Sequence, residues 1–208
     1  MAPMQTKTVE PNEWQPEGLR ERKRRDTLQR ITQVGLDLFL AAGYEATTLD
    51  DIAAAAGISR RTFFHYFKSK DEILLAWQMG MGDAVRDAVL EASTDQSPLE
   101  ALCGALRKLA SYFDTDTAIG IAQVLRSSDQ LRAANQAKYT HIEHSAFESL
   151  CRLWPGRSRR GPLRMAAMAG VGAFRVAIDE WIDEGGKGAL TKRIEKAFDD
   201  LRAALHGG

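Results

Sequence analysis

Apolar residues recur every three or four positions along most of the chain, the spacing that places them on one face of an α-helix. The pattern begins within residues 19–42, where the stripe consists of Leu28, Ile31, Gly35, Leu38 and Phe39. No segment alternates apolar and polar residues with the period of a strand, and no internal repeat is present. We therefore predict an all-α fold of about nine helices.

Helix-breaking and helix-capping residues divide the rest of the chain. Ser97 and Pro98 suit the start of one helix, Ser127–Asp129 suits another, and the glycine-rich residues 185–188 suit a turn. Residues 1–18 contain three prolines among mostly polar neighbours, which is typical of a flexible arm. Beyond residue 70, the predicted helices cover residues 71–92, 99–113, 118–126, 129–154, 163–184 and 190–205.

A tighter pattern between residues 47 and 70 predicts two short helices around a turn. The apolar positions of the first helix share one face: Leu49, Ile52, Ala53 and Ala56. Gly57 can then adopt the left-handed conformation that ends a helix, and the Ser59 side chain can cap the next one. This arrangement is typical of a helix-turn-helix DNA-binding element, and an ordinary helical hairpin is the alternative.

The second short helix has one apolar and one polar face. Phe63 and Phe67 are four residues apart, so we expect both to face inward with Ile52 and Ile58. The side chains left outward are Arg60, Arg61, Thr62, Phe64 and His65. Guanidinium groups can pair with guanine through two hydrogen bonds, so this face suits contact with DNA bases.

The charge is unevenly distributed along the chain. The formal net charge of all 208 residues is zero, but residues 19–70 contain ten Lys and Arg against six Asp and Glu. The run Arg20–Arg25 could contact phosphates or a minor groove, and a solvated helix end is the alternative. A basic N-terminal module on a mildly acidic body fits a polyanionic partner at one end.

The region from about residue 20 to 75 resembles the DNA-binding region of the tetracycline-repressor (TetR) family of bacterial transcription regulators. The residues that carry the resemblance are Ala42–Tyr44, Thr47, Thr48, Ile52, Ala53, Ala56–Ser59, Phe63, Phe64, Tyr66, Phe67 and Ser69–Asp71. The resemblance implies a helix-turn-helix DNA-binding domain at residues 19–70 and a ligand-binding and dimerisation domain at residues 71–208. It also implies a regulator, usually a repressor, that binds a palindromic operator in double-stranded DNA as a homodimer and is released by a small apolar effector.

The resemblance also implies roles for individual residues in DNA binding. The positions of Thr48, Tyr66 and Lys70 mostly hold phosphates in the family, and those on the outward face of the second short helix supply most base contacts. The complete predicted set is Arg24, Thr48, Ser59, Arg60, Arg61, Thr62, Phe64, His65, Tyr66 and Lys70.

Two further sets of candidates follow from the predicted second domain. Large and polar side chains of the middle helices could line an effector cavity, or form plain core: Trp77, Met81, Phe113, Gln123, Arg126, Phe147, Met168 and Arg175. Asn135 and His141 are additional polar candidates, and no motif ranks them. The last two helices could pair with a second copy, or pack within one chain, through Phe174, Ala177, Ile178, Trp181, Ile194, Phe198 and Leu201.

The alternative function is a helical metal-binding protein or an enzyme. His141, His144 and Glu148 share one predicted helix face and could hold a metal ion, but no second pair completes a di-metal site. Cys103 and Cys151 form neither a metal motif nor a disulfide framework. We therefore expect no enzymatic activity, metal or cofactor. The absence of an 18-residue apolar run and of a signal-peptide pattern predicts a cytoplasmic protein without membrane contact.

Overall fold

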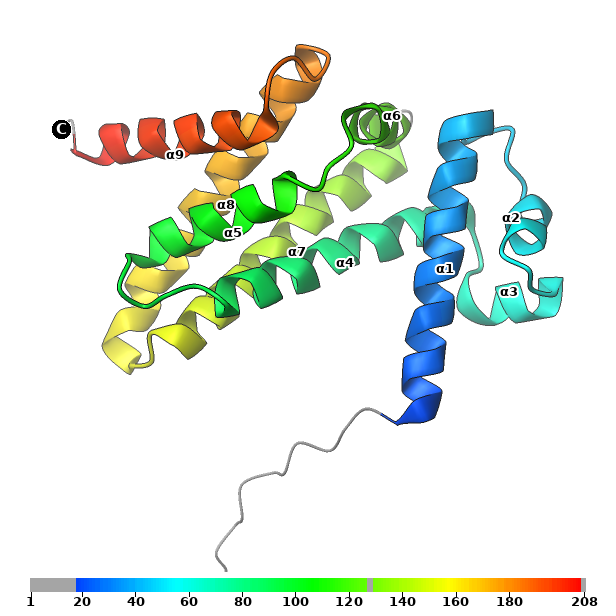
Figure 1. Cartoon of the computed structure of the whole chain (residues 1–208), viewed down its shortest axis with the longest axis horizontal. Helices are drawn as coiled ribbons and strands as arrows, with labels where there is room; N and C mark the ends of the chain where they lie inside the picture. Colours follow the sequence, from blue (N-terminus) through cyan, green and yellow to red (C-terminus); the bar gives the residue numbers. More distant parts are fainter. Residues whose placement is uncertain (1–17, 127–128, 207–208) are drawn as a thin grey trace, which may run out of the picture.

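The computed structural model describes residues 18–126 and 129–206 of the chain, and within these ranges it consists of helices joined by turns and loops, with no strand (Figure 1). The all-α prediction is confirmed. The predicted arm, apart from Gly18, and the predicted cap at Ser127 and Ser128 fall outside the described residues. The helices are α1 (Leu19–Ala42), α2 (Leu49–Ala55), α3 (Arg60–Tyr66), α4 (Lys70–Leu90), α5 (Pro98–Ala110), α6 (Thr115–Arg126), α7 (Asp129–Leu153), the 3-10 turn η1 (Arg157–Arg159), α8 (Arg160–Asp183) and α9 (Leu190–His206).

Two helices begin earlier than predicted. The predicted loop at residues 155–162 is wrong in its second half, because α8 begins at Arg160 and contains Pro162 in its first turn. Proline is tolerated there, since the first backbone N–H groups of a helix have no intrahelical partner. Helix α6 begins at Thr115 instead of Ala118, because the Asp114 carboxylate accepts a hydrogen bond from the Thr117 backbone N–H at 2.9 Å.

The first three helices form a small unit around its own core. The side chains of Ile31, Ile52 and Phe63 are fully buried there. Gly35 of α1 lies against Ile73 of α4, and a Cβ atom at position 35 would come within 2.9 Å of that side chain. The start of α4 therefore packs tightly onto the small unit.

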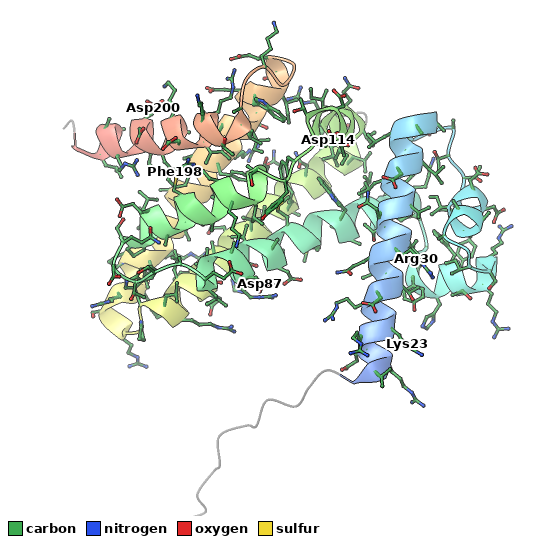
Figure 2. The ribbon with its side chains drawn as sticks, viewed as in Figure 1. Lys23, Arg30, Asp87, Asp114, Phe198 and Asp200 are labelled. Carbon is green, nitrogen blue, oxygen red and sulfur yellow. The ribbon has the colours of Figure 1, made fainter. Side chains whose placement is uncertain are left out.

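The larger unit is built from the remaining helices. Helices α4, α5 and α7 run side by side, and α8 and α9 close one side of the bundle (Figure 1). Leu102 and Leu106 of α5 and Ile142 of α7 are fully buried in this core. In Figure 2, Phe198 lies on the side of α9 that faces α5, and its side chain is fully buried.

Helices α4 and α6 connect the two cores. Ile73 and Leu74, near the start of α4, belong to the small core, whereas Val85 and Val89 belong to the large one. Ile121 of α6 also packs in the small core. The predicted domain boundary at residue 70 stays a prediction. Because α4 and α6 connect the two cores, a displacement of either helix would change contacts in both units.

Candidate functional site

Local hydrogen bonds shape the α2–turn–α3 segment. The Thr48 hydroxyl accepts a hydrogen bond from the Asp51 backbone N–H at 3.1 Å, and the Asp51 carboxylate accepts one from the Thr48 N–H at 2.9 Å. The hydrogen bond from the Thr48 hydroxyl lowers the pKa of the Asp51 carboxyl, and the bond from the backbone N–H adds to this effect. Gly57 has a φ of 64°, and Ser59 caps α3 by accepting from the Thr62 N–H at 3.1 Å. The predicted Ser59 cap and glycine turn are confirmed.

The two faces of α3 differ as the sequence pattern predicts. Phe63 and Phe67 are buried, with ring centroids 6.0 Å apart, whereas Phe64 is 40% exposed and His65 is also exposed. Helices α2 and α3 lie on the side of α1 that faces away from α5, α8 and α9 (Figure 1). The outward face of α3 is therefore open to a large partner.

Both arginines of α3 are exposed, but only Arg60 has an ionic partner within the described part of the chain. Arg60 Nη1 lies 3.0 Å from Asp50 Oδ2, and its guanidinium lies 5.6 Å from the centre of the Phe64 ring. An exposed ion pair contributes about 0–1 kcal/mol, so Arg60 can exchange Asp50 for a base or phosphate at little cost. Arg61 forms no ion pair or side-chain hydrogen bond with the described part of the chain.

Lys70, a predicted phosphate contact, is already engaged within the small unit. Its Nζ donates to the Tyr44 carbonyl oxygen at 2.6 Å and lies 4.5 Å from the centre of the Tyr44 ring. The Tyr44 hydroxyl donates to Asp71, and burial together with this hydrogen bond raises the pKa of Tyr44. These contacts fasten the α1–α2 connection to the start of α4. A phosphate contact from Lys70 stays a prediction, and it requires the ammonium to give up part of this arrangement.

The other predicted DNA contacts lie around the same unit. The Thr48 hydroxyl is occupied by Asp51, and Tyr66 is partly buried with its ring 5.5 Å from that of His65. Arg24 is exposed on α1, and Lys23 and Arg30 lie along the same helix in Figure 2. Basic side chains thus extend beyond α3 along the N-terminal half of α1.

A cavity of about 380 Å³ lies where the two units meet. Its volume falls in the range of about 300–1,000 Å³ that small-molecule sites usually have. Gln33 and Leu36 of α1 line it together with residues from α4, α6, α7 and α8. The walls are mainly apolar and aromatic, and they include Trp77, Phe113, Tyr139, Phe174 and Trp181.

The structure brings half of the predicted ligand-binding residues together in this cavity. Trp77, Met81, Phe113 and Arg126 line it, whereas four others lie elsewhere. Gln123 and Met168 are exposed, Phe147 is buried with the guanidinium of Arg160 4.9 Å from its ring, and Arg175 donates to Gln136 Oε1 at 2.7 Å. Size and polarity alone did not separate cavity residues from core and surface residues on the same helices.

Part of a polar group in the cavity wall was not predicted from the sequence. Asn135 and Lys138 of α7 and Asp179 of α8 all line the cavity. Asn135 Oδ1 is buried and has no hydrogen-bond partner in the described structure. Burial lowers the pKa of Lys138 to about 8, Arg175 contributes to the lowering, and Asp179 opposes it. Burial also raises the pKa of Tyr139. The missed signal is that positions 135 and 138 fall on the apolar stripe of α7 between Leu131 and Ile142.

The predicted dimer face needs correction. Five of its seven residues are buried within one chain, because α8 and α9 turn their most apolar faces to the core: Phe174, Ala177, Trp181, Ile194 and Phe198. Ile178 and Leu201 are partly exposed. The opposite face of α8 exposes Met165, Met168 and Val176, and Asp200 lies on the outer side of α9 (Figure 2). The alternative, packing within one chain, holds for the five buried residues.

The structure assigns no metal site to the histidines of α7. His141 packs against Gly82 of α4, His144 is exposed, and the described residues contain no group of three His, Cys, Asp or Glu side chains suited to a metal ion. The two cysteines are free, and burial raises the pKa of both thiols. None of the helices within residues 18–126 and 129–206 has the length and apolar character needed to cross a membrane.

Solved structures of similar fold are transcription regulators. FadR of Thermus thermophilus, a TetR-family repressor solved with lauroyl-CoA, is 25% identical, with a TM-score of 0.56 over 86% of this chain and 94% of that one. The fatty acid degradation regulator FadR of Bacillus halodurans is 20% identical and has a TM-score of 0.60 over 92% and 99%. The latter likeness supports the fold alone.

Sequence comparison identifies the family. Residues 31–77 match the family described as bacterial regulatory proteins, tetR family. The HTH-type transcriptional regulator TcmR of Streptomyces glaucescens is 41% identical over 202 residues, which cover 90% of this chain and 88% of the relative. The HTH-type transcriptional repressor KstR2 of Rhodococcus jostii is 29% identical over 155 residues, or 72% and 68% of the two chains. The chain belongs to the TetR family of bacterial transcription regulators.

Proposed function

We propose that this regulator is a homodimeric repressor that binds a palindromic operator through α3 and is released by a small, mainly apolar effector. It would act in the cytoplasm, where the operator DNA lies. The observation that carries the proposal is the open polar face of α3, held on a compact unit that shares two helices with a cavity-bearing body.

DNA binding by α3 is supported by the division of its side chains. Buried Phe63 and Phe67 fix the orientation of the helix, so that Arg60, Arg61 and His65 all remain accessible. Bidentate pairing of an arginine with guanine discriminates by about 1–3 kcal/mol against another base. Phe64 can contact the methyl group of thymine from the same face.

Dimerisation is supported by an exposed apolar surface on α8 and α9. Met165 and Val176 of α8 are 66% and 52% exposed, and Leu205 of α9 is 69% exposed. The small residues Ala169 and Gly172 lie on the same surface of α8 and would let a partner helix approach closely. A second copy would cover this surface and supply a second α3, which doubles the contacts on a two-fold symmetric site.

Control by an effector is supported by the position of the cavity. Residues from α1, α4 and α6 line it, and these are the helices that carry or contact the small unit. Gly120 of α6 packs so closely on Leu40 of α1 that a Cβ atom at position 120 would come within 2.4 Å of it. A ligand that favours one spacing of α4 and α6 would therefore also favour one position of α3.

Selection from a pool of random duplexes tests the DNA-binding part. We expect wild-type protein to enrich a two-fold symmetric sequence, and the double substitution of Arg60 and Arg61 by Ala to abolish the enrichment. The folded state of the variant is checked by circular dichroism, because both side chains are exposed and their loss leaves the core intact. Enrichment of the same sequence by the variant would contradict the proposal.

A further inference from the structure

We propose that the effector is an organic weak acid, with an apolar, ring-sized body, an anionic carboxylate or phenolate that accepts from the Lys138 ammonium, and a hydroxyl that donates to Asn135. The inference rests on the proposed function, because it names the ligand class of the same cavity. It concerns binding by the cavity and is tested without DNA.

Among the described residues that line the cavity, Lys138 is a cation without an ion pair or hydrogen bond. Its ammonium lies 4.4 Å from the centre of the Tyr139 ring, and it has neither an ion pair nor a hydrogen bond with the part of the chain that the structure describes. The Lys138 side chain is partly buried, and removing part of the water around an ammonium without supplying a partner is unfavourable, since nothing replaces the lost hydration. The anionic group of a bound ligand would remove this penalty, so the unligated cavity is prepared for an anion.

The other charged groups of the cavity already have partners. Asp179 Oδ2 lies 3.6 Å from Arg175 Nε, and Arg126 Nη2 lies 2.8 Å from Asp183 Oδ1. Asp114 accepts from the Thr117 N–H at the start of α6. The negative charge of Asp179 also favours the charged form of Lys138. Because Asp179 is paired with Arg175, a ligand anion can still reach the Lys138 ammonium.

Asn135 supplies the second polar contact. It precedes Lys138 by three residues on α7, so the two side chains share one face of the helix, with Cβ atoms about 5–6 Å apart. Its Oδ1 atom is a buried acceptor without a partner in the described structure. Leaving such an acceptor unsatisfied is unfavourable, and a ligand hydroxyl would remove this cost.

The rest of the wall selects for an apolar body. Trp77, Phe113, Phe174 and Trp181 surround the polar pair with aromatic surface, and Ile121 and Ile142 add aliphatic surface. Aromatic rings pack well in such a site through offset or edge-to-face contacts. A fully hydrophilic acid would leave these walls without apolar contacts.

The test uses three small probes and the full-length protein, with binding measured by calorimetry. The probes are 4-hydroxy-2-naphthoate, its neutral carboxamide, and 2-naphthoate, which lacks the hydroxyl. We expect Lys138→Met to weaken the hydroxynaphthoate at least about tenfold and the carboxamide less than about threefold. Asn135→Leu should abolish the preference for the hydroxyl-bearing acid over 2-naphthoate. Lys138→Arg retains the charge and should keep most of the affinity.

Two results would overturn the inference. One is that none of the acids binds at concentrations up to about 1 mM, and the other is that Lys138→Met weakens acid and carboxamide alike. Failure of the proposed function is a separate result: operator affinity would then be the same with and without a bound acid. Because the binding assay contains no DNA, the two failures are distinguishable.

Discussion

Single side chains in this protein differ in whether their polar groups are satisfied within the chain. Thr48, Ser59 and Lys70 hold the helix-turn-helix unit together through hydrogen bonds of their own. Arg61 is exposed and has no such partner among the described residues, and Lys138 is partly buried without one. Groups that folding leaves unpaired are the ones best placed to bind a partner.

Arg61→Ala should lower affinity for the selected operator by about 1–3 kcal/mol, or roughly 5- to 150-fold, because the guanidinium loses its contact with a base. Fluorescence polarisation with a labelled duplex measures the change at fixed salt. Arg157→Ala is the matched control, since it removes an exposed arginine near α8, far along the chain from α3. Equal losses from both variants would mean that only overall charge matters.

Lys138→Met should stabilise the unligated protein. The folded-state pKa of Lys138 is about 8, below the unfolded value of about 10.4, so the charged form is disfavoured by folding. Below pH 8 both states carry the proton and the full penalty is present, whereas it disappears as pH rises from 8 to above 10. The variant should therefore gain on the order of 1–3 kcal/mol in free energy of unfolding at pH 7.

Urea unfolding at several pH values measures this difference. The gain of Lys138→Met over wild type should shrink steadily between pH 8 and 10. Lys192→Met, at an exposed position of α9, is the control and should change stability by less than about 0.5 kcal/mol. A gain that does not depend on pH would show that improved packing, not loss of the buried charge, stabilises the variant.

The sequence predicted the inward and outward faces of α3 better than the cavity residues, and the reason is physical. A short amphipathic helix that follows a glycine turn and a capping serine can pack in one way, with Phe63 and Phe67 inside. Cavity residues depend on how five helices meet. Phe147 and Phe113 look alike in sequence, yet only Phe113 lines the cavity.

At the scale of elements, close contact between α4 and α7 controls the geometry of the body. Gly82 of α4 faces His141 of α7, and a Cβ atom at position 82 would come within 2.3 Å of the imidazole ring. Gly80 lies on the same helix with no atom within 4 Å of its own Cβ position. Close packing therefore explains the glycine at position 82 but not the one at position 80, although both glycines weaken the helix intrinsically.

Gly82→Ala should destabilise the protein by about 1–3 kcal/mol, because the added methyl group must displace the His141 side chain of α7. Gly80→Ala should instead stabilise it by about 0.5–1 kcal/mol, since alanine favours the helix. Chemical denaturation of the two variants and wild type gives both values. If Gly82→Ala were as stable as Gly80→Ala, the close packing of α4 on α7 would not be required.

Helix positions followed from periodicity, whereas some helix starts did not. The bounds of α1 agree with the prediction because Gly43 ends an uninterrupted stripe. Helix α6 begins earlier than predicted because Asp114, the residue before it, caps its first turn. Helix α8 begins earlier because Pro162 fits within its first turn. Both cases depend on local backbone geometry that the apolar pattern does not record.

At the scale of the whole molecule, folding leaves an apolar surface of α8 and α9 exposed. Val176 lies near the middle of the exposed face of α8, and the groove beside it reaches Ala197 and Leu201 of α9. The sequence could not distinguish this face from the buried one, since both faces of α8 contain apolar residues. Packing within one chain covers one face of α8 and leaves the other face exposed to a partner.

Val176→Glu should convert the proposed dimer into monomers, because a carboxylate would be buried at the proposed two-fold interface without a partner. Light scattering coupled to size exclusion measures the mass of each species against the 23.0 kDa chain. Gln123→Glu adds the same charge at an exposed position of α6 and should remain dimeric. Two equally dimeric variants would place the interface elsewhere.

Hydroxyl-radical footprinting on the selected operator tests most directly whether two copies of α3 read DNA. The proposed arrangement predicts two protected half-sites whose centres lie about 34–36 Å apart on one face of the duplex. Arg61→Ala should weaken both half-sites together, and Val176→Glu should abolish the paired pattern. Protection of a single site, or a pattern that neither substitution changes, would contradict the account.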